Sequence, residues 1–246
     1  MTMLASWMIL LAFAGAPTQA SVGDLVSGLR AVPNVVHVSV HGNAVDSAGT
    51  IIHIRNWHYL PLELFAADIL AQSDEDIETE EIERRFRDFL DEVEAVQKQQ
   101  VTVLAWLAKR GHRNVWVEGL TDDSIRTFEA YAADYKLFGK IRTSRLELGA
   151  PGRMLAEGKM TVLPLEDKEA MDAAEPDAVT AEFAEEDNLA REDAMVCRIV
   201  SRGLPVNVVM LGGAHDLPGG LKRLQCDDWC VITVDVKAYR AAAGEE

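Results

Sequence analysis

Short apolar segments alternate with long amphipathic ones along this 246-residue chain, and that alternation constrains its fold more than any other feature. The short segments are rich in Val and Ile, which is typical of β-strands. Six strands are expected, at 35–40, 50–54, 114–120, 160–164, 206–211 and 230–236. Strands separated by helices form parallel sheets, because each crossover helix returns the chain to the same end of the sheet. The sequence therefore predicts an α/β fold with a mainly parallel sheet flanked by helices.

The longest helix is expected over 77–109, where apolar residues recur every three or four positions among many charged ones. Gly111 follows it as a stop signal. Other helices are expected from Pro61, from Thr121 to about Leu137, over about 180–202, and briefly before the last strand. The stretch 149–158 is expected to be irregular. The resulting fold has one long acidic helix and one acidic helical segment.

The second acidic segment, 166–193, holds twelve acidic and two basic side chains, a net charge of 2 − 12 = −10. Charge runs of this kind are typical of a solvated helix face or a loosely held insertion. A calcium site is the alternative, although the segment lacks an Asp-x-Asp-x-Asp-Gly loop. The chain as a whole carries a formal net charge of −16. This argues against nucleic-acid binding, since phosphate contacts need clustered Lys and Arg, and against docking on anionic membranes.

The first twenty residues are similar to a signal peptide. Residues 3–14 are apolar apart from Ser6, and small residues follow up to Ala20, where cleavage is expected. No Lys or Arg precedes the apolar run, which is too short to span a bilayer comfortably. We therefore expect a signal peptide over 1–20, a single α/β domain over 21–246, export to the periplasm or beyond, and no membrane span in the mature chain. The alternatives are a buried N-terminal helix or a misassigned start codon in a cytoplasmic protein.

Three cysteines cannot form a disulfide framework. Cys226 and Cys230 are separated by three residues, which is a weak metal signal without a second pair, so a structural role is favoured. Cys197 lies on a predicted helix and is expected in the core.

Polar side chains follow three of the predicted strands at the points where these strands end: His58, Glu118, and the pair His215 and Asp216. If these strands are parallel neighbours, the side chains meet in one crevice at the carboxyl edge of the sheet. Two imidazoles and a carboxylate are a ligand set for Zn²⁺, Mn²⁺ or Co²⁺, and equally an acid–base set for hydrolysis without metal. Ordinary structural roles compete with this reading: a helix cap for Glu118 and a surface or core hydrogen bond for His58.

Four short motifs carry a family resemblance. Arg55-Asn56-Trp57-His58 is similar to a Gly-Glu-x-His motif, and Val117-Glu118-Gly119-Leu120 ends a strand in Glu. Arg191-Glu192-Asp193-Ala194-Met195 is similar to a helical Arg motif, and the segment 212–219 to Gly-Ala-x-His-Leu-x-Gly. Together they resemble the superfamily that joins erythromycin esterases, ChaN haem-binding lipoproteins and TraB/TIKI metalloproteases, over roughly 51–239.

The resemblance implies a site built from His58, Glu118, Arg191 and His215. Asn56 stands where the family has Glu. An amide cannot act as a general base and is a poor metal ligand, but it can orient a water molecule or a histidine.

We therefore expect a hydrolase of esters or peptides that acts on a small molecule or peptide. A metal held by His58, Glu118 and His215 would activate water, and Arg191 would stabilise negative charge. One alternative is a haem or iron-ligand binder of the ChaN type, with His58 or Tyr59 as the axial ligand. The other is a catalytically degenerate interaction protein with an acidic surface. The residues expected to contact a bound cofactor are Asn56, Tyr59, Gly213 and Asp216. The sequence leaves the oligomeric state open.

Overall fold

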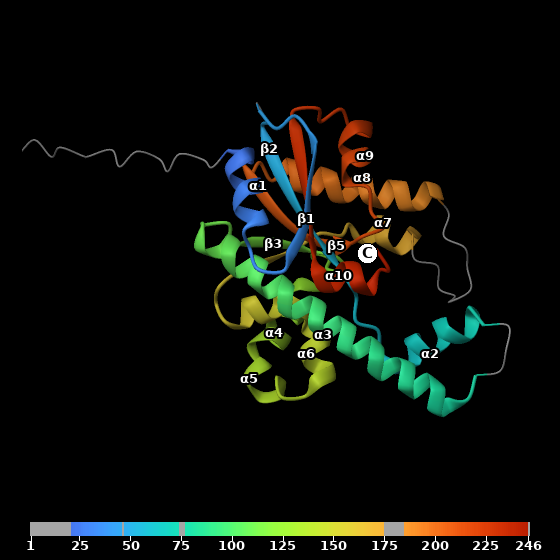
Figure 1. Ribbon diagram of the computed structural model, residues 1–246. Coiled ribbons are helices and arrows are strands. Elements are labelled where there is room, and N and C mark those ends of the chain that lie inside the picture. Colours follow the sequence, from blue (N-terminus) through green and yellow to red (C-terminus); the bar gives the residue numbers. More distant parts are fainter. Residues whose placement is uncertain (1–20, 46, 74–76, 175–184, 246) are drawn as a thin grey trace, which may run out of the picture.

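The computed structural model describes residues 21–45, 47–73, 77–174 and 185–245, so the predicted signal peptide over 1–20 lies outside it (Figure 1). The described strands form one sheet in the order β1-β6-β2-β5-β3-β4. Neighbouring strands are parallel except for β1, which pairs antiparallel with β6 at one edge. The strands are β1 (Val35–Gly42), β2 (Gly49–Asn56), β3 (Asn114–Val117), β4 (Thr161–Pro164), β5 (Val206–Gly212) and β6 (Trp229–Val236). The predicted mainly parallel α/β fold is confirmed.

Helices cover both faces of the sheet (Figure 1). Apolar residues of α1, α3, α6 and α10 pack on one face, and those of α8 and α9 on the other. The described helices are α1 (Val22–Arg30), α2 (Leu62–Ala71), α3 (Thr79–Lys109), α4 (Ile125–Ala133), α5 (Tyr135–Phe138), α6 (Arg142–Ala156), α7 (Lys168–Ala174), α8 (Glu185–Ser201), α9 (Leu217–Arg223) and α10 (Lys237–Ala242). None of them is long and apolar enough to cross a membrane.

The central strands are buried on both sides, which explains why their sequences are mostly apolar rather than alternating. In β2, Ile52 and Ile54 pack under α1 and α3, whereas Ile51 packs under α8. His53, also in β2, is 3% exposed, and its Nε2 lies 3.1 Å from the Leu211 carbonyl oxygen. Burial lowers the pKa of His53 to about 4, so this histidine is neutral and structural.

The order of the strands places a crevice at the ends of β2 and β5. The chain leaves β2 for α3, on one face of the sheet, and leaves β5 for α9, on the other face. Connections that leave adjacent parallel strands toward opposite faces leave an opening at the carboxyl ends of those strands, where ligands bind in open α/β sheets. Because β3 is the other neighbour of β5, the segments that follow β2, β3 and β5 lie side by side.

Helix α3 is 31 residues long, or roughly 46 Å. Its second half packs on the sheet through Val103 and Leu104. Its first half extends away from the sheet and packs against α2 (Figure 1). The contact includes the rings of Phe65 and Phe89, whose centroids are 5.0 Å apart.

Several local predictions were wrong. The stretch 149–158 is largely helical, because α6 only breaks at Gly149, at φ 68°, and continues from Pro151, a residue that suits a first helical turn. The predicted helix 121–137 is divided into α4 and α5. Cys197 is exposed rather than in the core, and all three cysteines are free thiols. Of the predicted helix over 180–202, residues 180–184 lie outside the described part.

Candidate functional site

Glu118 lies at the centre of a cluster of polar contacts at the carboxyl ends of three neighbouring strands. It directly follows β3, and its side chain is 13% exposed. Its Oε2 accepts a hydrogen bond from the Gly212 backbone N–H at 2.7 Å and lies 2.8 Å from His58 Nε2. Its Oε1 lies 3.1 Å from His215 Nε2. The structure thus brings His58, Glu118 and His215 together, while their catalytic roles stay predictions.

The Glu118 carboxyl group is ionised in this setting. Burial raises its pKa, but the hydrogen bonds from His215 and His58 outweigh burial and hold the pKa well below its usual value. The Gly212 N–H adds a third donor. A carboxylate with these three donors is a poor base and a strong counter-ion.

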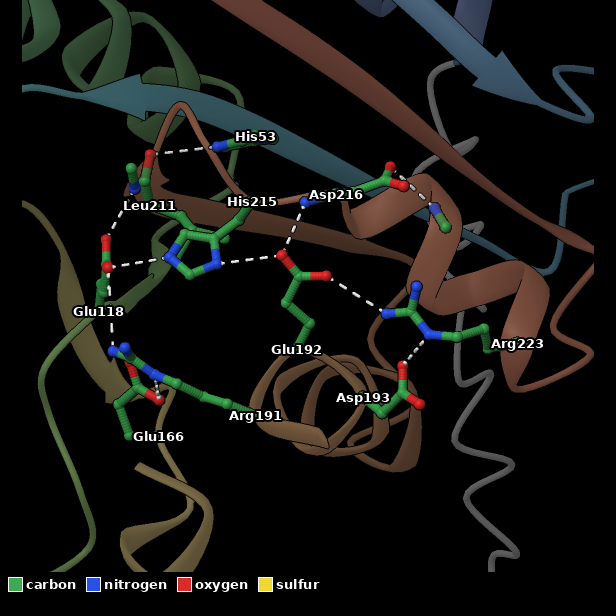
Figure 2. A network of polar contacts seen from close by, with 12 residues as sticks. His53, Glu118, Glu166, Arg191, Glu192, Asp193, Leu211, His215, Asp216 and Arg223 are labelled. Carbon is green, nitrogen blue, oxygen red and sulfur yellow. Dashed lines mark hydrogen bonds and ion pairs between the residues drawn. The ribbon is translucent and has the colours of Figure 1, made fainter. Parts of the chain in front are cut away.

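His215 lies between two carboxylates, as Figure 2 shows. Its Nε2 contacts Glu118, and its Nδ1 lies 3.2 Å from Glu192 Oε1. Burial lowers the pKa of His215, but the hydrogen bonds to Glu118 and Glu192 raise it to about 9. His215 is therefore an imidazolium at neutral pH, with both ring N–H groups donating.

Arg191 of α8 is 7% exposed and forms a fork with Glu166 (Figure 2). The distances are 2.6 Å from Nη2 to Oε1 and 3.1 Å from Nε to Oε2, while Glu118 Oε1 lies 3.9 Å from Nη2. Arg191 therefore supports Glu118 from behind rather than facing a bound substrate. The acidic segment was predicted as a solvated face, but Glu166 and Glu192 are buried within it and paired with cations.

Asn56 connects His58 to helix α3. Its Nδ2 lies 3.3 Å from His58 Nδ1, and its Oδ1 accepts a hydrogen bond from Gln100 Nε2 at 3.1 Å. Gln100 is fully buried and was not predicted as a site residue. Its signal was present in the sequence, because Gln97 and Gln100 interrupt the apolar stripe of the long helix at helical spacing.

Tyr59, Gly213 and Asp216, the other residues predicted to contact a cofactor, lie around this cluster, and each has a different structural role. Tyr59 lines a small cavity of about 240 Å³, and burial raises its pKa. Gly213 gives the backbone its close approach to Tyr239, since a Cβ at position 213 would lie 1.8 Å from the Tyr239 hydroxyl oxygen. Asp216 caps α9 by accepting a hydrogen bond from the Gly219 N–H at 3.0 Å, so its carboxylate is used by the helix.

Two cavities lie against the His58–Glu118 pair. The smaller is the 240 Å³ cavity, with Leu146 and Met210 in its wall. The larger is a cleft of about 710 Å³ that also reaches His215 and is walled mainly by aromatic and apolar side chains. They include Trp57, Leu60, Phe65, Phe89 and Tyr239. These residues come from four separate parts of the chain, which is why the sequence alone did not indicate them.

The predicted metal ligands do not fit a divalent cation as they are arranged. Glu118 already accepts three hydrogen bonds, and each ring nitrogen of His215 faces a carboxylate oxygen rather than an open position. Among the described residues, no group of three or more His, Cys, Asp or Glu side chains could hold a metal ion. Haem meets a similar obstacle, because both nitrogens of His58 have hydrogen-bond partners. The metal and the haem both stay predictions.

Comparison of the chain with protein-family models, with curated proteins and with solved structures found no match. The resemblance of its motifs to the esterase, haem-binding and metalloprotease superfamily therefore stays a prediction.

Proposed function

We propose that this protein is a hydrolase of esters or peptides in which His58 is the general base and Glu118 orients it. The observation that carries the proposal is the continuous row His58–Glu118–His215 facing the 710 Å³ cleft. A carboxylate bonded to one ring nitrogen holds an imidazole in position and stabilises the cation that forms when the other nitrogen takes a proton. Here Glu118 binds Nε2, which leaves Nδ1 as the basic atom on a side chain that is 45% exposed.

Asn56 supplies a place for the attacking water. Its Nδ2 lies 3.3 Å from His58 Nδ1, a direct contact that leaves no room for a water molecule between the two atoms. In the proposed reaction a water molecule displaces this contact, so that the amide donates to the water oxygen while the water donates to Nδ1. This role needs no carboxylate at position 56, so an Asn there is compatible with hydrolysis.

His215 balances the charge of Glu118 beside the cleft. It lines the cleft beside Gly212 and Gly213 and is an imidazolium at neutral pH. Both of its ring N–H groups already donate, one to Glu118 and the other to Glu192, so neither is left for the carbonyl oxygen of a substrate. Its role in the proposed reaction is to hold the ionised Glu118 in place against His58.

The cleft favours substrates with an apolar part. Phe65 and Phe89 lie on its walls with Trp57 and Tyr239, and the reacting groups lie at one side. Apolar walls with a few convergent polar groups are typical of small-molecule sites. A small molecule or a short peptide segment with an apolar or aromatic group beside its scissile bond fits this description.

Hydrolysis of ester and peptide panels by the purified chain, before and after dialysis against a chelator, tests the proposal. We expect activity that survives the chelator and falls by about 10²–10⁴-fold in His58→Ala, the range for loss of a general base. The control is His41→Ala, an exposed histidine on β1, which should leave the rate unchanged.

Activity that disappears with the metal and returns on its addition would favour the metal-dependent reaction instead. A chain that hydrolyses nothing but shifts the haemin Soret band would favour the haem alternative. Neither activity in a folded chain would favour an interaction protein.

A further inference from the structure

A backbone carbonyl group fixes which atoms donate and which accept in the hydrogen bonds around Asn56. Gln100 Nε2 lies 3.0 Å from the Arg55 carbonyl oxygen and 3.1 Å from Asn56 Oδ1. A carbonyl oxygen only accepts, so the Gln100 atom that faces it is the NH₂ group. The same NH₂ group therefore donates to Asn56, and the Asn56 atom that faces Gln100 is its oxygen.

The orientation of Asn56 then determines whether Nδ1 of His58 faces a donor or an acceptor. With Oδ1 turned toward Gln100, the amide NH₂ of Asn56 faces His58 Nδ1 at 3.3 Å. An NH₂ group only donates, so Nδ1 has to be the nitrogen without a proton. The proton of the neutral ring lies on Nε2, which is the atom that faces Glu118 Oε2 at 2.8 Å. Every donor in this row faces an acceptor.

The carbonyl end of the Gln100 side chain has an unsatisfied hydrogen-bond acceptor. It is 0% exposed, and its Oε1 finds no partner among the described residues. An unsatisfied buried acceptor costs about 1–3 kcal/mol. An apolar residue would fill the same place on the buried stripe of α3 without that cost, so the amide is there for its donor side.

We propose that Gln100 is a positioning residue that turns the Asn56 amide so that its NH₂ group faces His58 Nδ1 and leaves Nδ1 unprotonated, while Glu118 holds the proton of the ring on Nε2. Gln100 does not touch the cleft and acts only through Asn56. The consequence for catalysis rests on the proposed function, because only a base needs a free lone pair on Nδ1. The tautomer itself does not depend on what the protein hydrolyses.

The test is two-bond ¹H–¹⁵N correlation spectroscopy of the full chain labelled with ¹⁵N-histidine, which reports which nitrogen of His58 carries the proton. The variants are Gln100→Met, which removes the donor and keeps the volume, and Asn56→Asp, which replaces the donor by an acceptor. The matched control is Gln97→Met, one helical turn earlier. Gln97 is also buried, and its Nε2 donates to the Leu146 carbonyl oxygen instead of Asn56.

We expect the Nε2–H form of His58 in the wild type and in Gln97→Met. In Gln100→Met the Asn56 amide is free to turn its oxygen toward Nδ1, so we expect a partial additional proton on Nδ1, and in Asn56→Asp a full one. A wild type protonated on Nδ1, or a Gln100→Met spectrum with the wild-type tautomer, would overturn the inference. If Gln100→Met does not fold, Asn56→Asp decides the matter, since an unprotonated Nδ1 in that variant contradicts the relay.

Kinetics separate this inference from the proposed function. If the chain is a hydrolase, Gln100→Met should lower kcat by about ten- to a hundredfold and leave KM unchanged, which is the cost of a misplaced reacting group. If the wild type hydrolyses nothing but shows the expected tautomers, the proposed function fails and the role of Gln100 stands.

Discussion

Replacing Glu118 by Gln keeps the shape of the central side chain and removes its charge. His215 then keeps Glu192 as its carboxylate partner, while its burial is unchanged, so its pKa falls from about 9. The rise from 6.5 to about 9 in the wild type corresponds to roughly 3 kcal/mol of stability. Breaking a buried charge pair by removing one partner costs about 3–5 kcal/mol. At pH 6 we therefore expect Glu118→Gln to lower the free energy of unfolding by about that amount.

The pH dependence of that difference is the sharper part of the prediction. A group whose pKa is raised by folding stabilises the protein fully below its unfolded pKa and loses this contribution as the pH rises through its folded pKa. For His215 the loss falls between 6.5 and about 9. The stability gap between wild type and variant should therefore narrow by up to roughly 3 kcal/mol between pH 6 and pH 9.5.

Glu118 contributes with the opposite sign. Its pKa is lowered by folding from 4.5, so its contribution is present above that pH and is lost as the pH falls toward the depressed value. Urea denaturation at several pH values measures both effects. The control is Glu129→Gln, an exposed carboxylate on α4. Parallel stability curves for wild type and Glu118→Gln from pH 6 to 9.5 would refute the assignment of His215 as an imidazolium held by Glu118.

Three further substitutions probe the supports of the site. Arg191→Met leaves the buried Glu166 carboxylate without its fork, so chemical denaturation should show a loss of about 3–5 kcal/mol, and a loss below 1 kcal/mol would contradict the pairing. Gly213→Ala places a Cβ against Tyr239 and should lower the stability by about 1–3 kcal/mol; a neutral result in thermal unfolding would argue against that close approach. Asp216→Ala removes the cap of α9 and should lower the free energy of unfolding by about 1 kcal/mol. The tautomer of His58 should stay that of the wild type in this variant, and a changed tautomer in the ¹H–¹⁵N spectrum would contradict the prediction.

The sheet was predictable because its central strands are buried on both faces. Such strands are mostly apolar, as 206–211 shows with five apolar residues and one Asn, and glycine or polar residues follow each of them. The same boundaries located His58, Glu118 and His215, since the ends of parallel strands meet at one edge. Their convergence still required β2, β3 and β5 to be neighbours, and nothing local in the sequence encodes that order.

The acidic residues and the helix break were beyond sequence reasoning for physical reasons. Composition cannot tell which members of an acidic run face inward, and Glu166 and Glu192 are buried only because Arg191 and His215 lie opposite them. A glycine followed closely by a proline usually indicates a loop. Here Gly149 ends one helical segment and Pro151 begins the next, within a single packed unit.

Because helix α3 contributes both to the wall of the cleft and to the residues behind His58, a change in its position affects both. The same helix carries Phe89 at the wall of the cleft and Gln100 behind His58, the proposed base, about three turns apart. Tilting this helix to admit a bulkier molecule would move Gln100 away from Asn56 and so disturb the proposed protonation of His58. Helix α2 touches α3 through Phe65 and contributes only to the wall. If the cleft binds a substrate as proposed, a change in substrate size therefore disturbs His58 least when α2 is remodelled and α3 stays fixed.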